Sequence, residues 1–347
     1  MRHLASIQKI WKIEPVEGAD RIELAHVQGW QVVVQKGQFH PWDLAVYFEI
    51  DSFLPVRPEF EFLRSSSYRK SDILGEGFRL KTRSLRGKIS QGLLMPISAF
   101  PEIREMDPEP YEKQDVTGLL GVREWEIPER LTTSGTIIGS LPPDIPKTDE
   151  TRVQACPELI NEFRGLEYYI ATKMDGTSCS CCIDLNGVFH ITGHNYEYKD
   201  DGRSTFYRLL KERGTEGKMR SLMKERGWNT LTLQGEYCGP GIQGNRLKLK
   251  KGEWYVFTVY INGERAGLDE MKTVCDRLDL TMVPVEERGT ALDERYPTVE
   301  ALLARADGEY PNGGKKEGIV IRPAVPVFCR LIAASLSMKV VSNRYLA

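Results

Sequence analysis

The sequence predicts an α+β protein with two parts, and three observations carry this prediction. Up to about residue 128, short β-branched or aromatic runs alternate with Gly, Pro and Asp, which is typical of strands. A segment rich in Pro, Gly, Ser and Thr follows, as expected of a linker. The remainder alternates strand-like and helix-like segments. We therefore predict a β-rich domain at 1–128, a linker at 129–145 and a mixed α/β domain at 146–347.

The first part has the features of a small β-barrel. Residues 27–34 and 44–50 are β-branched or aromatic runs bounded by turn residues, and we expect a strand in each. Many short strands separated by Gly-rich turns predict a closed antiparallel barrel.

The clearest helical signal lies at residues 204–226. Apolar residues recur there at near-helical spacing, and Gly214 and Gly217 interrupt the pattern. Two helices separated by a break are expected.

Composition and charge exclude several classes of protein. The chain of 347 residues is 41% hydrophobic and 28% charged, which is ordinary for a globular protein. No apolar run is long enough to span a bilayer, and the N-terminus lacks the apolar core of a signal peptide, so we expect a cytoplasmic protein without a membrane partner. The cysteines at 179, 181 and 182 lack zinc-site spacing and are expected to be buried thiols.

The net charge of −2 hides local basic stretches. Between Arg64 and Lys88 there are eight basic residues and two acidic ones. In a strand at 78–83, Phe78 and Leu80 would be buried while the cations would share the other face. We predict a nucleic-acid-binding surface from Arg79, Lys81, Arg83, Arg86 and Lys88; a solvated strand face is the alternative.

A second basic stretch lies at residues 246–250, where cations and leucines alternate. A strand there would present Lys248 and Lys250 for contact with a phosphate backbone. An edge strand that carries lysines against aggregation is the competing interpretation.

Lys173 is the most informative residue in the second part. It lies in Thr172-Lys173-Met174-Asp175-Gly176, directly after an apolar run, where an amine can be held against a phosphate. A single Lys-x-Asp-Gly match is weak, because such residues also form ordinary turns. Four further segments follow in a fixed order, at 235–239, 255–257, 317–322 and 337–340.

In this order the segments resemble the nucleotidyltransferase motifs of the covalent ligase and capping-enzyme superfamily. Residues 15–22 and 85–93 resemble the OB folds that bind tRNA in some synthetases. Together the two parts resemble the Deinococcus-type ATP-dependent RNA ligases. The resemblance implies an N-terminal OB barrel followed by an ATP-grasp-like nucleotidyltransferase domain of antiparallel sheets and helices.

The resemblance also implies an activity. ATP would adenylylate Lys173, AMP would pass to a 5′-phosphate, and a 3′-hydroxyl would displace AMP to seal RNA or an RNA-containing nick in RNA repair. ATP and Mg²⁺ or Mn²⁺ are the implied cofactors, and we expect a monomer.

Roles for individual residues follow from the same resemblance. Catalysis is expected from Lys173, Asp175 and Lys339, and a metal ion from Asp175, Glu236 and Glu317, since carboxylates suit hard cations. Nucleotide binding is expected from Arg152, Thr172, Met174, Glu236, Phe257 and Lys339. Phe257 would stack on the purine, although a core aromatic is the default for such a residue.

One departure from the family pattern bears on the fifth motif. Where relatives often have Lys-x-Lys, this chain has Ser337-Met338-Lys339, which removes one expected phosphate contact. Only eight residues follow Lys339, so we expect no OB domain there. An RNA guanylyltransferase and a catalytically silent RNA-binding protein are the alternative functions.

Overall fold

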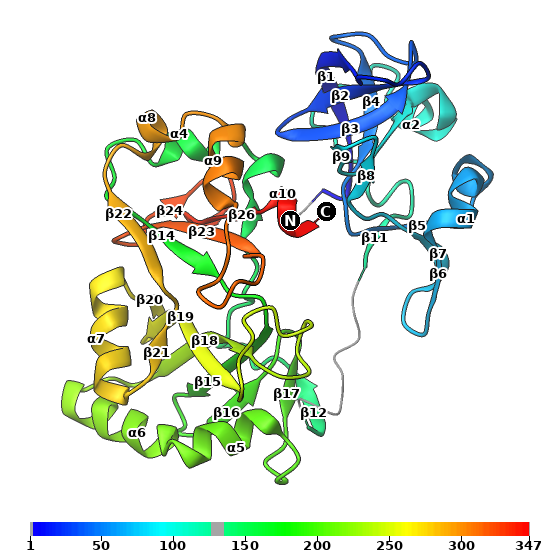
Figure 1. Ribbon diagram of the computed structural model, residues 1–347. Helices are drawn as coiled ribbons and strands as arrows, with labels where there is room; N and C mark the ends of the chain where they lie inside the picture. The colour runs from blue at the N-terminus through cyan, green and yellow to red at the C-terminus, as the bar shows by residue number, and fades with distance from the viewer. Residues whose placement is uncertain (1–2, 126–134, 347) are drawn as a thin grey trace. The chain divides into compact units, whose positions relative to one another are not determined.

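The computed structural model of the chain describes residues 3–125 and 135–346. The packing divides the chain into two compact units. The first comprises mainly Met1–Ile127, and the second mainly Pro128–Val153 and Glu158–Tyr345. In Figure 1 the first unit is blue to cyan and the second is mostly green to red.

The first unit is a curled antiparallel arrangement of strands, as the sequence predicts. Its larger sheet has the order β10-β4-β1-β2-β3. These strands are β1 (Ala5–Pro15), β2 (Ile22–Val27), β3 (Trp30–Gln35), β4 (Leu44–Phe48) and β10 (Leu93–Pro96). A second sheet has the order β11-β5-β7-β6, with β5 (Ser52–Pro55), β6 (Tyr68–Ser71), β7 (Gly75–Arg79) and β11 (Arg123–Glu124). Strands β8 (Arg83–Leu85) and β9 (Lys88–Ser90) form a hairpin, and the short helices are η1 (Pro58–Leu63), α1 (Arg64–Ser67), η2 (Ile97–Ala99) and α2 (Pro101–Met106).

Alternation along β4 divides the core of this unit in two. Val46 and Phe48 belong to one buried cluster, whereas Ala45 and Tyr47 belong to another. Successive side chains of a strand point to opposite faces, so β4 is covered on both sides. This explains why its sequence is apolar throughout instead of alternating with polar residues.

The prediction of a single strand at 27–34 was wrong, because this segment contains a hairpin turn. The chain turns back after Val27, and β2 and β3 pair as a hairpin with Val27 opposite Trp30. Gln28 has a φ of 49°, the left-handed conformation that tight hairpin turns require. A two-residue turn is too short to interrupt the β-branched pattern visibly.

Two sheets build the second unit. One has the order β12-β17-β16-β15-β18-β19-β20, and β21 pairs with β19. Its strands are β12 (Ile137–Ser140), β15 (Thr177–Ile183), β16 (Phe189–Thr192), β17 (Tyr196–Tyr198), β18 (Leu231–Cys238), β19 (Glu253–Ile261), β20 (Glu264–Arg265) and β21 (Thr281–Met282). The other has the order β13-β26-β23-β14-β22, with β13 (Thr151–Arg152), β14 (Tyr168–Lys173), β22 (Val285–Gly289), β23 (Gly318–Pro323) and β26 (Met338–Val341). A small hairpin joins β24 (Phe328–Cys329) to β25 (Ala334–Ser335).

Helices flank these sheets (Figure 1). They are η3 (Val153–Ala155), α4 (Leu159–Glu162), α5 (Thr205–Glu212), α6 (Thr215–Arg226), α7 (Leu268–Leu278), α8 (Leu292–Arg295), α9 (Val299–Ala306) and α10 (Asn343–Leu346). The predicted pair of helices with a break is confirmed, because α5 and α6 are separated at Gly214, which has a φ of 62°. Ser204 caps α5 by accepting a hydrogen bond from the Tyr207 amide. None of the helices in the described part of the chain is both long and apolar enough to cross a membrane.

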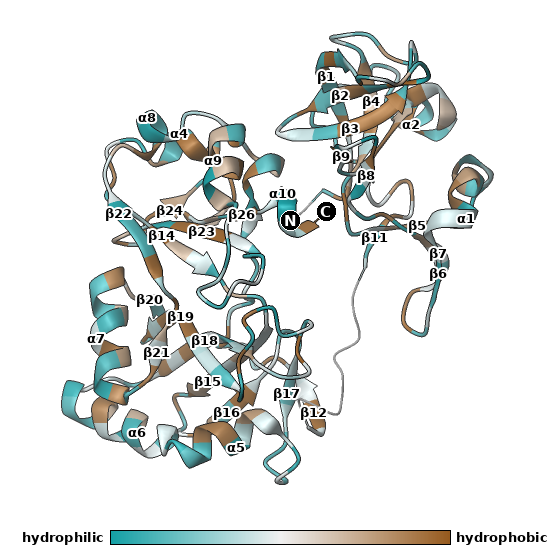
Figure 2. Cartoon of the chain, in the orientation of Figure 1, coloured by the Kyte–Doolittle hydropathy of each residue, from teal (hydrophilic) through white to brown (hydrophobic). Residues whose placement is uncertain are grey.

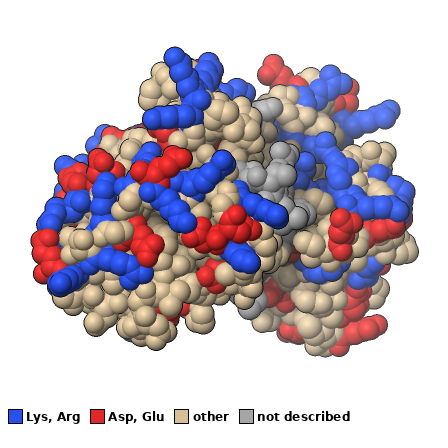
Figure 3. All heavy atoms as spheres, turned by 90° about the horizontal axis from the view of Figure 1, so that it is seen from below, with Lys and Arg blue, Asp and Glu red and all other residues tan. Residues whose placement is uncertain are grey.

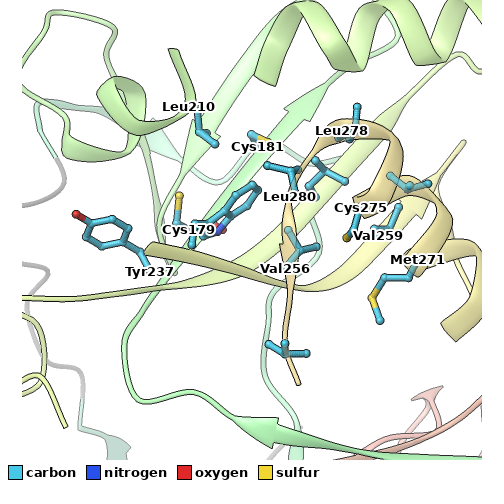
Figure 4. Packing of buried hydrophobic residues seen from close by; sticks show 14 of the residues in the cluster. Cys179, Cys181, Leu210, Tyr237, Val256, Val259, Met271, Cys275, Leu278 and Leu280 are labelled. Atoms are coloured by element: carbon cyan, nitrogen blue, oxygen red, sulfur yellow. The ribbon is translucent and has the colours of Figure 1, made fainter. Parts of the chain in front are cut away.

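The main core of the second unit lies between β15, β18 and β19 and the helices α5 to α7. Cys179 and Cys181 point into it together with Val256, Val259 and Met271 (Figure 4). Cys179, Cys181 and Cys182 are buried free thiols, as predicted from their spacing. Apolar residues are concentrated along the strands and on the inner faces of the helices (Figure 2).

Two segments that connect larger elements, at 137–140 and 246–250, differ from what the sequence predicts. Ile137–Ser140, inside the expected linker, forms β12 and pairs with β17, while residues 126–134 lie outside the described part. The strand expected at 246–250 was wrong, since these residues lie in a loop between β18 and β19. Lys248 has a φ of 52°, which a continuous strand cannot contain.

Trp254 supplies a test of the core of the second unit. Its side chain is fully buried, and its indole Nε1 donates a hydrogen bond to the Cys179 carbonyl at 3.0 Å. Trp254→Phe removes volume and leaves that carbonyl unpaired, so unfolding should become easier by about 1–3 kcal/mol. Thermal unfolding followed by circular dichroism measures the change. Trp42→Phe, at a side chain that is 69% exposed, is the matched control, and equal effects of the two would contradict this assignment.

Candidate active site

A cavity of about 280 Å³ opens between the two sheets of the second unit. Several predicted site residues line it: Thr172, Lys173, Met174, Glu236, Phe257 and Lys339. These six residues come from four segments that are far apart in the sequence, and the two sheets bring the segments together. The predicted segments therefore converge on one pocket.

Strand pairing places Lys173 beside Glu317. Lys173 ends β14 and lies opposite Gly318, the first residue of β23. A side chain at Gly318 would collide with the Val340 carbonyl of β26, so the close approach of β26 requires glycine there. The Lys173 Nζ atom lies 2.8 Å from Glu317 Oε1. The Lys-x-Asp-Gly and Glu-Gly segments thus meet through an ion pair.

The charge on Lys173 follows from this pairing. Burial alone would lower its pKa, but the attraction of Glu317, joined by that of Glu236 where Glu236 is ionised, outweighs burial and holds the pKa above its usual value. Arg152 opposes this shift by repulsion. The amine is therefore an ammonium ion in this state and has to lose a proton before it can attack phosphorus.

Tyr310 fixes the geometry of the ion pair and was missed by the sequence analysis. Its hydroxyl donates to the Lys173 carbonyl at 2.7 Å and accepts from the Glu317 amide at 3.2 Å. The side chain is buried, so these bonds hold the ends of the two strands together. No local pattern around residue 310 signals this role, because it depends on a contact across 137 residues.

Glu236 faces the pocket from β18 and has an unusual protonation state. Burial raises the pKa of its carboxyl to about 8; Lys173 opposes the rise, whereas Glu317 and Asp175 add to it. A neutral carboxylic acid therefore lies beside the Lys173–Glu317 ion pair at neutral pH.

Asp175 has two partners, Tyr345 and Arg246. It accepts a hydrogen bond from the Tyr345 hydroxyl at 3.0 Å, and Arg246 Nε lies 3.2 Å from its second oxygen. Burial, followed by repulsion from Glu317, raises its pKa. The Arg246 guanidinium also lies 4.3 Å from the centre of the Tyr345 ring. Arg246, expected on a phosphate-binding strand, is instead the partner of Asp175.

Lys339 lines the pocket, and Arg152 lies next to it on the neighbouring strand. Arg152 of β13 pairs with Lys339 of β26 in a parallel register. The Lys339 Nζ atom lies 3.9 Å from Asp149, a side chain that is 65% exposed. Lys339 and Lys173 both line the pocket, and Arg152 is near enough to repel the charge of Lys173, so this region favours an anionic ligand.

The predicted metal carboxylates supply part of the donor set that hard cations need. Within residues 3–125 and 135–346, no group of three or more His, Cys, Asp or Glu side chains is arranged to hold a metal ion. Mg²⁺ and similar cations use one or two carboxylates and complete their shell with water and substrate phosphates. Glu236, which lines the pocket, and Glu317, which lies beside Lys173, supply that number of carboxyl groups. Asp175 is already engaged by Arg246 and Tyr345.

The predicted nucleic-acid-binding residues have different environments. Lys81, Arg83, Arg86 and Lys88 are exposed, and Phe78 and Leu80 are buried as expected. Arg79 is only 18% exposed, lies 3.5 Å from Asp51 and stacks 4.9 Å from the Trp125 ring centre, so it differs from the expected exposed cation. Lys248 and Lys250 are exposed in the loop after β18. Over much of the face in Figure 3, basic side chains lie beside acidic ones, in keeping with the net charge.

A second ion pair, between Glu286 and the buried Lys316, supports the end of β14. Glu286 accepts a hydrogen bond from the Thr172 hydroxyl at 2.8 Å, and Lys316 Nζ lies 2.9 Å from both of its oxygens. Thr172 and Lys316 directly precede Lys173 and Glu317, so Glu286 fixes the backbone beneath both members of the ion pair. The sequence analysis missed Glu286, which lies in no recognised motif.

Comparisons with known proteins place this site in a family. A family model described as RNA ligase matches residues 166–341, and one described as an OB-fold domain matches residues 4–97. A mutant of Naegleria gruberi RNA ligase solved with AMP and Mn is 32% identical, with a TM-score of 0.85 over 99% of this chain and 98% of that chain. The chain belongs to the RNA ligase family.

Two further structures of Naegleria gruberi RNA ligase are similarly close. One with PPi has a TM-score of 0.84 at 32% identity and covers 100% of this chain and 98% of that chain. Another mutant, with ATP and Mn, has a TM-score of 0.85 at 32% identity and covers 99% and 98%. A search of curated protein sequences finds no match.

Membership of the RNA ligase family confirms the predicted fold. The N-terminal OB unit is followed by a mixed α/β ligase unit, as the motifs indicated. The finer assignment to the Deinococcus type is not decided by these comparisons, and the roles of single residues stay predictions.

The raised pKa of Glu236 predicts how stability depends on pH. This carboxyl titrates near pH 8 when folded and near 4.5 when unfolded, so between these values the folded state binds more protons. The contribution of Glu236 to stability therefore falls as the pH rises through this window. Glu236→Gln removes the titration, and its stability relative to wild type should grow by a few kcal/mol, in order of magnitude, between about pH 5 and pH 8.

Thermal unfolding in a chelator at several pH values measures this difference. Glu212→Gln, at an exposed position in α5, should show no such trend. A constant difference between Glu236→Gln and wild type would mean that the carboxyl is ionised throughout.

Proposed function

We propose that this RNA ligase uses ATP and a divalent metal ion to join a 5′-phosphate to a 3′-hydroxyl, through AMP bound covalently to Lys173. The observation that carries the proposal is the convergence of Lys173, Glu236, Phe257 and Lys339 on one pocket. The solved relatives with ATP, AMP and PPi support it.

In the first step, the Lys173 Nζ atom attacks the α-phosphorus of ATP. A phosphorus–nitrogen bond forms, the bond to the leaving pyrophosphate breaks, and the amine gives up its proton. Phe257 would stack on the purine from β19, while Lys339 and Arg152 would attract the phosphates from β26 and β13. Tyr310 and Glu286 would keep Lys173 in line by fixing the strands on either side.

The second and third steps transfer and then release AMP. An oxygen of the 5′-phosphate attacks the phosphorus of lysyl-AMP, and the phosphorus–nitrogen bond breaks to regenerate the Lys173 amine. The 3′-hydroxyl then attacks the 5′-phosphorus, AMP leaves, and a phosphodiester forms. Glu236 and Glu317 would hold a divalent cation, which when bound supplies positive charge to the reacting phosphates.

We also propose that the enzyme is of the Deinococcus type and acts as a cytoplasmic monomer. An OB unit that precedes the ligase unit supports this subtype. The OB unit would bind the broken RNA or RNA/DNA nick through Lys81, Arg83, Arg86 and Lys88. Arg79 would support this surface from its half-buried position, and Lys248 and Lys250 would contact the backbone near the pocket.

Lys173→Ala tests the central step. Without the amine no phosphorus–nitrogen bond can form, so incubation with Mg²⁺ and α-labelled ATP should leave no acid-stable label on the denatured variant. The exposed Lys224→Ala is the control and should label like wild type. Labelling of Lys173→Ala would refute the assignment. Labelling of wild type by GTP in place of ATP would favour a guanylyltransferase, and no label from either would favour a silent RNA-binding protein.

Lys81→Ala combined with Arg86→Ala tests the role of the OB unit. Loss of two exposed cations should weaken binding of a nicked RNA duplex about tenfold at moderate salt and flatten its salt dependence. Self-adenylylation without RNA should be unchanged. Lys36→Ala with Arg104→Ala removes two exposed cations elsewhere in the unit and serves as control. Equal loss of binding in both double variants would show that only total charge matters.

A further inference from the structure

A buried ionic cluster lies beside the nucleotide pocket. It consists of Glu150, Arg265, Arg322 and Ser337, and we refer to it as the Arg322 cluster. Glu150 Oε1 accepts hydrogen bonds from Arg322 Nη2 and from Arg265 Nη2, the latter at 3.4 Å. Arg322 Nε lies 3.4 Å from the Ser337 hydroxyl oxygen, which accepts its hydrogen bond. Glu150 and Arg322 both line the pocket.

The cluster carries one positive charge in excess. Burial alone would raise the pKa of Glu150, but Arg322 and Arg265 outweigh burial and lower the pKa to about 2. Burial, and then repulsion from Arg322, lowers the pKa of Arg265. Glu150 therefore stays ionised, and its one negative charge is shared between Arg322 and Arg265.

Arg322 also donates a hydrogen bond to the other sheet. It lies in β23, and its Nη1 donates to the Phe257 carbonyl in β19. Its guanidinium carbon is 5.9 Å from the centre of the Phe257 ring. A planar guanidinium with donors in three directions thus ties β23, β19 and Ser337 together, which an ammonium group cannot do. Phe257 is the aromatic wall of the pocket to which the purine is assigned.

We propose that Arg322 is a positioning residue that sets ATP affinity through Phe257, and that position 337 holds a small uncharged side chain because a third cation cannot be accommodated beside Arg322. This rests on the proposed function. A lysine at 337 would bring a third cation to a buried site that holds one carboxylate, which is costly. The serine found where relatives often have lysine is then an adaptation to the Arg322 cluster rather than a lost phosphate contact.

The two interpretations of Ser337 predict opposite results. If serine only leaves a contact missing, Ser337→Lys restores the family pattern and should strengthen ATP binding. If serine serves Arg322, Ser337→Lys should weaken ATP binding about tenfold or more. Ser337→Ala removes the hydroxyl alone and should weaken ATP binding by no more than about threefold.

Arg322→Lys tests the positioning role directly. The rate of self-adenylylation is measured against ATP concentration. The KM for ATP should rise about tenfold, because lysine lacks the planar guanidinium that bonds to Glu150, Ser337 and the Phe257 carbonyl. The rate at saturating ATP should stay within about twofold, since a positioning residue does not take part in the chemical step. Arg288→Lys, at a surface ion pair in β22, is the matched control and should leave both values unchanged.

A double-mutant cycle decides whether the effect passes through Phe257. If it does, adding Arg322→Lys to Phe257→Leu should raise KM much less than Arg322→Lys does alone. Additive effects, or a lower saturating rate at unchanged KM, would overturn the proposal, as would tighter ATP binding by Ser337→Lys. If Arg322→Lys fails to fold, the Ser337 variants still decide. If wild type becomes labelled and every variant has the same KM and saturating rate, this inference is refuted and the proposed function stands. If wild type is not labelled, the proposed function is refuted as well.

Discussion

The ion pair between Lys173 and Glu317 is the contact on which the site depends. It exists because β14 and β23 pair in a register that sets Lys173 opposite Gly318. A slip by one residue would turn Lys173 to the opposite face of the sheet. Tyr310 stabilises this register through hydrogen bonds to the backbone of Lys173 and of Glu317. Glu286 does so through the side chains of the two preceding residues, Thr172 and Lys316.

Buried charge in the second unit is compensated in separate groups rather than in one network. Lys173 has Glu317, Lys316 has Glu286, and Arg322 has Glu150. Removing one member of such a pair leaves a buried charge without its partner, which costs far more than a surface ion pair contributes. Glu236 needs no cationic partner at neutral pH, because burial keeps its carboxyl protonated. Each group can therefore hold its place before a nucleotide is bound.

Local pattern predicted more of the fold than of the contacts within the site. Periodicity gave the break at Gly214 and the burial of Phe78 and Leu80, because these depend on neighbours in sequence. It failed at residues 246–250, where alternation suited a strand but Lys248 adopts a left-handed conformation. Motif order placed Lys173 in the correct pocket. It included Arg322 in the segment 317–322 but could not reveal the contacts of Arg322, or Tyr310 and Glu286. These contacts join residues that are 65 to 172 positions apart in the sequence.

Each sheet of the second unit supplies part of the pocket. The β14–β23–β26 side carries Lys173 and Lys339, which would engage phosphates, and the β18–β19 side carries Phe257, which would engage the base. The affinity for a nucleotide that contacts both sheets would depend on the distance between the sheets, because covalent bonds limit the distance between its base and its α-phosphate. The bond from Arg322 in β23 to the Phe257 carbonyl in β19 crosses this gap next to the pocket. This bond would set the distance between Phe257 and Lys173. A buried arginine whose hydrogen bonds go to Glu150, Ser337 and the Phe257 carbonyl would in this way affect nucleotide affinity.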